Sequence, residues 1–124
     1  MIRVTVQNGG LSPISREEMQ SIVKLIPSRL TKGMDSITLC YTHESGPYVT
    51  FHQKESSLCL YGFSKDDSES TKLDTIKELF VSLTAISELG DMPKRITNNK
   101  WNQYLSEWES ELETCKKIFD KSAT

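Results

Sequence analysis

Hydrophobic and polar residues alternate at the start of the chain, with the two-residue period of a strand that buries one face. Ile2, Val4 and Val6 share one side of the segment 2–7, and polar residues occupy the other side. Asn8-Gly9-Gly10 then predicts a turn, because these residues tolerate positive φ. We therefore expect the chain to open with a half-buried strand.

A helical period replaces this alternation after residue 14. Ser15 and Glu18 have the spacing of a capping box, in which each side chain binds the other residue's free backbone N–H group. The apolar positions that follow share one helical face: Met19, Ile22, Val23 and Ile26. Pro27 is expected to end this helix, because it lacks an N–H group and clashes with the preceding turn.

Three further strands are predicted next. Alternation marks the segments 37–42 and 48–53, and the third segment, 58–63, is apolar on both faces. A run of that kind is typical of an interior strand or of a covered edge strand. Turns are expected at Ser45-Gly46-Pro47 and at Lys54–Ser56. These short links favour an antiparallel meander of three strands.

A second helix is predicted after the polar loop 64–70. Ser70 or Thr71 is the expected N-cap, and Gly90 is the expected C-terminal cap. The apolar face of this helix is wide, as is typical of a central helix packed on a sheet. It comprises Leu73, Ile76, Leu79, Phe80, Leu83 and Ile86.

The last predicted helix runs from Thr97 or Asn98 to about Phe119 and carries the strongest functional signal in the chain. An aromatic and apolar stripe follows one face: Trp101, Tyr104, Leu105, Trp108, Leu112, Cys115, Ile118 and Phe119. Glutamates crowd the remaining surface: Glu107, Glu109, Glu111 and Glu113. Such a stripe is either the other half of the core or, in part, a docking surface.

These elements predict one α+β domain over residues 1–124. The expected order is β-α-β-β-β-α-α: an N-terminal strand and helix, the antiparallel meander, and two C-terminal helices packed on one face of the sheet. Apolar residues make up 36% of the chain and charged residues 26%, so a hydrophobic core is expected rather than disorder.

Charge and hydropathy narrow the range of partners and compartments. Net charge is −2, and the 15 basic residues are scattered among 17 acidic ones, which disfavours nucleic acid as a partner. No stretch is apolar enough to predict a membrane span, and the first residues resemble a strand rather than a signal peptide. Three cysteines without close pairing suit a reducing compartment, so a cytoplasmic location is expected.

The candidates for metal or thiol chemistry are few. His43 and His52 flank one predicted hairpin, and Cys40 and Cys59 lie in neighbouring strands. No pair has the spacing of a structural zinc site, so no metal and no cofactor are expected. Cys59 and His52 could form a nucleophile pair, but no positive or helix-terminal environment is predicted that would lower the pKa of the thiol.

The order of the elements also resembles that of minimal zinc-peptidase cores, in which the central helix carries His-Glu-x-x-His. The corresponding helix here reads Ile76-Lys77-Glu78-Leu79-Phe80-Val81-Ser82-Leu83, without histidine. The resemblance implies a shared layout without the metal chemistry, and it rests on element order alone.

The absence of a catalytic constellation favours a non-enzymatic factor of accessory, regulatory or immunity type. Its expected partner is another protein or a second copy of the chain. The predicted anchors lie on the last helix, at Trp101, Tyr104, Trp108 and Glu111, with the hairpin 43–52 as a further surface.

The alternative hypothesis is a small-molecule-binding domain or an enzyme, including a metal-free relic of the zinc-peptidase layout. Its pocket would lie between the sheet and the second helix. Tyr41, His52 and Tyr61 would be its polar groups and Glu78 a possible base.

Overall fold

Four strands form one mixed sheet in the order β1-β2-β4-β3, and the helices pack against it. The computed structural model describes residues 2–7, 13–42, 47–63 and 69–122. The turn expected at residues 8–10 and residues 64–68 of the expected loop lie outside these ranges. The strands are β1 (Arg3–Val6), β2 (Ser36–Thr42), β3 (Tyr48–His52) and β4 (Ser57–Phe63).

The predicted meander is wrong in its pairing, although its three strands are present. β2 and β3 are not neighbours, because β4 lies between them, parallel to β2 and antiparallel to β3. The segment that is apolar on both faces is β4, and an interior position covers both its edges. β3 and β4 form a hairpin joined by a single 3₁₀ turn, η1 (Gln53–Glu55), so only this half of the meander exists.

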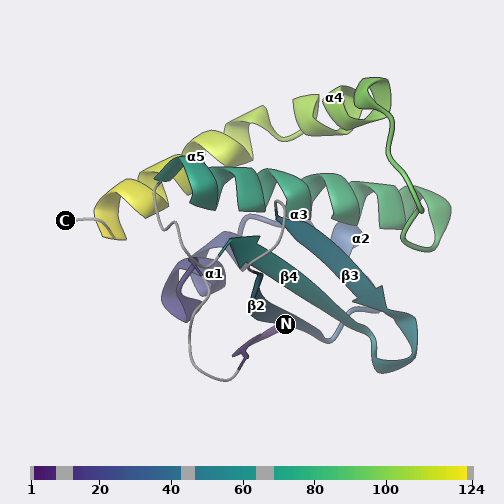
Figure 1. The fold of residues 1–124 in the computed structure, drawn as a ribbon, viewed down its shortest axis with the longest axis horizontal. Helices are drawn as coiled ribbons and strands as arrows, with labels where there is room; N and C mark the ends of the chain where they lie inside the picture. The colour runs from purple at the N-terminus through teal and green to yellow at the C-terminus, as the bar shows by residue number, and fades with distance from the viewer. Residues whose placement is uncertain (1, 8–12, 43–46, 64–68, 123–124) are drawn as a thin grey trace.

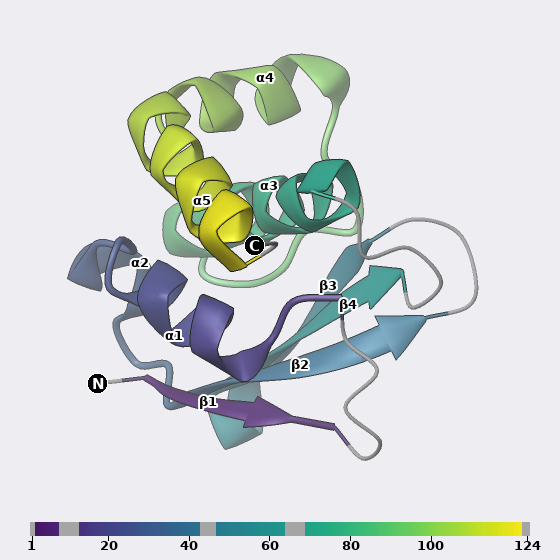
Figure 2. The same ribbon diagram turned by 90° about the vertical axis from the view of Figure 1, so that its left-hand side faces the viewer.

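All the described helices lie on the same side of the sheet, as Figures 1 and 2 show. They are α1 (Arg16–Val23), α2 (Ser28–Thr31), α3 (Glu69–Leu89), α4 (Asn98–Ser106) and α5 (Glu109–Ser122). α3 lies across the sheet, and α4 and α5 lie on the far side of α3 (Figure 1). The expected C-terminal packing on one face is therefore present, but the outer helices rest on α3 and α1 rather than on strands.

Strand alternation divides the sheet into a core face and an open face. The core face carries Val4, Ile37, Leu39, Val49, Leu58 and Leu60, which pack with α1 and α3 in one buried cluster. The register places threonine, cysteine and tyrosine side chains in rows on the other face, such as Thr5, Thr38, Cys59 and Thr50. None of the described helices covers this open face.

The capping box of α1 is confirmed. The Ser15 hydroxyl accepts the Glu18 backbone N–H, and the Glu18 carboxylate accepts the Ser15 N–H. The α-helix ends at Val23, earlier than expected, and tighter three-residue turns follow it: the Leu25 N–H binds the Ile22 carbonyl, and the Ile26 N–H binds the Val23 carbonyl. Pro27 instead occupies the N-cap position of the one-turn helix α2, which was not predicted.

The last helix is broken in two, so the prediction of one continuous helix to Phe119 is wrong. α4 ends at Ser106, and α5 begins at Glu109. The backbone N–H groups of Glu107 and Trp108 bind carbonyl oxygens only three residues back, which tightens the turn. The break lets Trp108 enter the core below α5 while Tyr104 faces α3 from α4.

α3 begins at Glu69, so Ser70 and Thr71 lie in its first turn rather than at its N-cap. Gly90 ends the helix as expected, with a φ of 82° and its N–H bound to the Ile86 carbonyl. None of the described helices is long and apolar enough to span a membrane.

Gly62 allows β4 to lie close against Pro13. A Cβ at this position of β4 would collide with the ring of the buried Pro13 and would also touch Thr75 of α3. Gly62→Ala should therefore lower the free energy of unfolding by about 1–3 kcal/mol, as overpacking typically does. Denaturant unfolding measures this, with Ser57→Ala on the open face of the same strand as the control. Equal stability of the two variants would contradict this contact.

Candidate functional site

The aromatic residues of the predicted docking helix are largely used inside the fold. Trp108 is 3% exposed, and its indole N–H donates to the Thr84 hydroxyl at 2.8 Å. The Thr84 hydroxyl donates in turn to the Phe80 carbonyl at 2.7 Å. The Trp108 ring also packs against that of Phe80, with the Arg29 guanidinium on its face. Trp108 is thus a core residue that joins the junction of α4 and α5 to α3 by a hydrogen bond and by ring packing.

Tyr104 and Trp101 take part in a second, smaller core. Tyr104 is 4% exposed and packs with Val81 and Ala85 of α3, and the partly buried Trp101 rests against this cluster. The Lys100 ammonium lies over the Tyr104 ring. Glu111 is partly buried on α5. Trp101 and Glu111 are therefore the two predicted anchors that a partner could reach.

The four residues of the alternative pocket are not brought together. Tyr61 and His52 lie on the open face of the sheet, where Tyr61 stacks on Tyr48 and His52 contacts Thr50. Glu78 belongs to α3, on the other side of the sheet. The side chain of Tyr41 lies outside the described residues, as does His43. The sheet therefore separates Tyr61 and His52 from Glu78.

Two of the three thiols are held in the protonated form by their surroundings. Burial, with a contribution from nearby Cys59, raises the pKa of Cys40 to about 11. Burial, with a contribution from Glu111, raises the pKa of Cys115 to about 12. Since the thiolate is the nucleophile, these two cysteines behave as small core residues near neutral pH. The described residues contain no cluster of three or more potential metal ligands.

A groove that sequence reasoning missed is lined by residues of β1, α1 and α2 and of the segments next to them. Figure 2 shows α1 and α2 on the same side of β1. We call it the β1–α1 groove; its volume is about 540 Å³. Its walls are formed by Ile2, Arg3, Val4, Arg16, Gln20, Val23, Lys24, Ile26, Ser28 and Thr31. The α1 wall is a single helical stripe, because its four residues recur at positions i, i+4, i+7 and i+8.

The charged residues of the groove all have the same sign. Arg16 and Lys24 contribute two exposed cations, Arg3 of β1 also lines the groove, and no acidic residue is among the lining residues. Within the described chain the ion pairs are Lys72–Glu18 and Lys100–Glu88, so neither pair neutralises a groove cation. The floor is apolar, formed by residues such as Val4, Val23 and Ile26. The site therefore suits a ligand that is both apolar and anionic.

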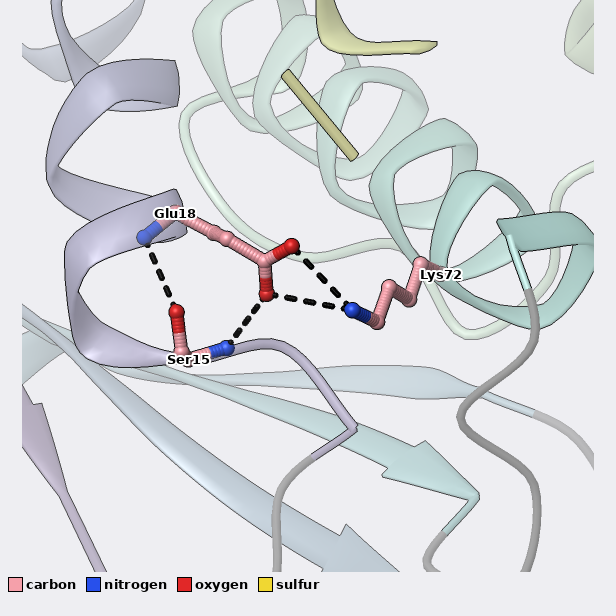
Figure 3. Close-up of polar contacts among 3 residues, drawn as sticks. All are labelled: Ser15, Glu18 and Lys72. Atoms are coloured by element: carbon pink, nitrogen blue, oxygen red, sulfur yellow. Dashed lines mark hydrogen bonds and ion pairs between the residues drawn. The ribbon is translucent and has the colours of Figure 1, made fainter. Parts of the chain in front are cut away.

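A buried carboxylate joins the first turn of α1 to α3 (Figure 3). Glu18 is 4% exposed, and besides closing the capping box with Ser15 it binds the Lys72 ammonium of α3 at 3.1 Å. The same group thus starts α1 and ties it to α3. The apolar face of α1 is turned inward, where Met19 and Ile22 are fully buried, while Arg16 and Lys24 stay exposed and line the groove.

The sequence carried only a faint signal for this groove. Arg16 and Lys24 lie eight positions apart on a helix whose apolar face is predicted correctly. Their significance depends on β1 lying below them at the edge of the sheet, which is a matter of strand order.

No family model, curated protein or solved structure matches this chain.

The Trp108–Thr84 hydrogen bond should be measurable as a coupling. Trp108→Phe and Thr84→Val should each lower the free energy of unfolding by about 1–3 kcal/mol, because each removes one partner of a buried bond. The double variant should lose less than the sum of both, with a coupling of about 1 kcal/mol by denaturant unfolding. Strict additivity would mean that the indole N–H and the hydroxyl do not interact.

Glu78 should make stability depend on pH. Its burial disfavours the charged form and raises the pKa of this carboxyl above its ordinary value of 4.5. The folded state therefore binds this proton more tightly than the unfolded chain, and stability from this group is lost as pH rises through the folded-state pKa. Glu78→Gln should raise Tm near neutral pH, and the gain should vanish below pH 4.5. The exposed Glu113→Gln is the control, and a pH-independent gain would contradict this origin.

Proposed function

We propose that this chain acts by non-covalent contact with another protein, and that the β1–α1 groove is its docking surface. The observation that carries the proposal is the combination of an apolar floor with a wholly basic rim, in a chain whose net charge is −2. Basic groups gathered at one concave surface favour an acidic partner and speed its association.

The last helix is the weaker docking surface for this function. Trp108 and Tyr104 would have to leave the core before a partner could bury them. Trp101 and Glu111 are more accessible, so a partner could extend onto that helix. The central contact of the proposal is therefore placed at the sheet edge rather than on α4 and α5.

A heterologous partner is favoured over a second copy of the chain. If two copies met through their grooves, Arg16 and Lys24 of each would approach the same cations of the other. Like charges that meet without neutralisation oppose association. A partner with carboxylate side chains brings the opposite charge to the same positions.

The small-molecule or enzyme hypothesis draws less support from the geometry. Its proposed polar groups, Tyr61 and His52, are separated from Glu78 by the sheet. A small acidic amphiphile is the version of that hypothesis that the β1–α1 groove would suit. It predicts saturation by a low-molecular-mass compound, whereas the protein-contact proposal predicts a macromolecular complex.

Affinity capture from the native cell lysate tests the proposal with three baits. The first is the wild-type chain, and the second is Arg16→Glu/Lys24→Glu, which reverses two exposed charges of the groove. The third is Lys116→Glu/Lys117→Glu, a matched reversal of two exposed charges on α5. We expect wild type and the α5 variant to recover the same protein, and the groove variant to lose it.

Circular dichroism should show the same helix content for all three baits, because the replaced side chains are exposed. If the three baits recover identical proteins, the groove is not the docking surface. If the α5 variant alone loses its protein, the docking surface is the C-terminal helix instead.

A further inference from the structure

We propose that the partner binds by adding a β-strand to the free edge of β1, through an extended acidic segment. Two acidic side chains four residues apart would flank a central apolar one in that segment. This inference rests on the proposed function and specifies the chemistry of the partner at the same site.

The first support is the free edge itself. β1 has one strand neighbour in the described sheet, β2, to which it runs parallel. The Arg3 N–H donates to the carbonyl of Asp35, the residue before β2, and the Gln7 N–H donates to the Leu39 carbonyl of β2. Because alternate residues of a strand point their backbone groups to opposite sides, Val4 and Val6 present theirs to the outer edge. These groups are what an added strand needs.

The second support is the match between helix and strand spacing. Arg16 opens α1, and Lys24 is its C-cap residue, still in the helical conformation. Eight residues at 1.5 Å each separate the two by about 12 Å. Residues four apart on an extended strand share a face and are separated by about 13 Å. Two carboxylates at that spacing would therefore meet both cations at once.

The third support is the apolar floor between the two cations. The side chain midway between the two acids points to the same face of the added strand. There it would meet Val4, Val23 and Ile26, the apolar wall of the groove. The pattern acidic–x–apolar–x–acidic thus matches the groove along its length.

The test uses a synthetic peptide with this pattern and the full-length protein. The peptide is Thr-Glu-Thr-Leu-Thr-Glu-Thr, acetylated and amidated so that its ends carry no charge. Titration of the ¹⁵N-labelled protein should shift the amide signals of β1 and α1, and hydrogen exchange at Val4 and Val6 should slow. A peptide with lysines for its glutamates should not bind.

Two comparisons separate strand addition from simple charge attraction. N-methylation of the leucine and the next threonine removes two consecutive backbone donors while keeping every charge, and this peptide should not bind. Val6→Pro removes an outward N–H at an edge position where proline is tolerated, and it should abolish binding, whereas Val6→Thr should retain it. Arg16→Glu/Lys24→Glu should weaken binding about tenfold or more.

If the N-methylated peptide binds as tightly as the unmethylated one, strand addition is overturned. This comparison uses the unaltered protein, so it does not depend on whether Val6→Pro folds. Failure of the acidic peptide to bind, while lysate capture stays dependent on the groove, would overturn this inference and leave the proposed function standing. If capture from the lysate is unchanged when the groove charges are reversed, the proposed function is wrong. If the protein is a dimer that dissociates when Val6 is replaced by proline, the strand added to β1 comes from a second copy of the chain, and the proposal of an acidic partner is overturned.

Discussion

The Glu18 carboxylate is the contact on which the candidate site depends. It accepts a backbone N–H at the start of α1 and pairs with Lys72 from α3, with both side chains largely withdrawn from solvent. Removing either partner of such a pair leaves a charge without compensation in a poorly polar environment. The carboxylate therefore caps the start of α1 and ties its first turn to α3. With Met19 and Ile22 buried on the inner face of the same helix, Arg16 and Lys24 remain exposed along the groove.

The described helices all pack on one face of the sheet, and this arrangement decides which surfaces a partner can reach. With every described helix on one face of the sheet, α3 is shared by two apolar clusters, one reaching the strands and the other reaching α4. Trp108 and Tyr104 are needed to fill these clusters, so they are poor anchors for a partner. Among the surfaces that stay available is the edge of the sheet beside α1, where backbone groups, apolar side chains and cations occur together.

Local signals predicted much of the fold. The two-residue period located β1, β2 and β3, and a run apolar on both faces located β4. The 3.6-residue period located α1 and α3, with Ser15, Glu18 and Gly90 correctly assigned as caps. These signals are short-range, because capping and amphipathicity involve residues within a few positions of one another. The break at Glu107–Trp108 escaped prediction because a continuous stripe is compatible with one helix. Only the fit of Trp108 against Thr84 and Phe80 makes two helices the better arrangement.

The chain's own pattern settled the α+β class and the inward faces of β1, α1 and α3, and it left β4 as either an interior strand or a covered edge strand. Strand order was decided by tertiary packing, since short links allow β4 to pair with β3 while also inserting beside β2. The same packing made β1 an edge and placed α1 over it, which created the β1–α1 groove from residues far apart in sequence. A periodic pattern encodes which side of an element avoids water, but not which element it meets. That choice depends on how all the buried surfaces fit together at once.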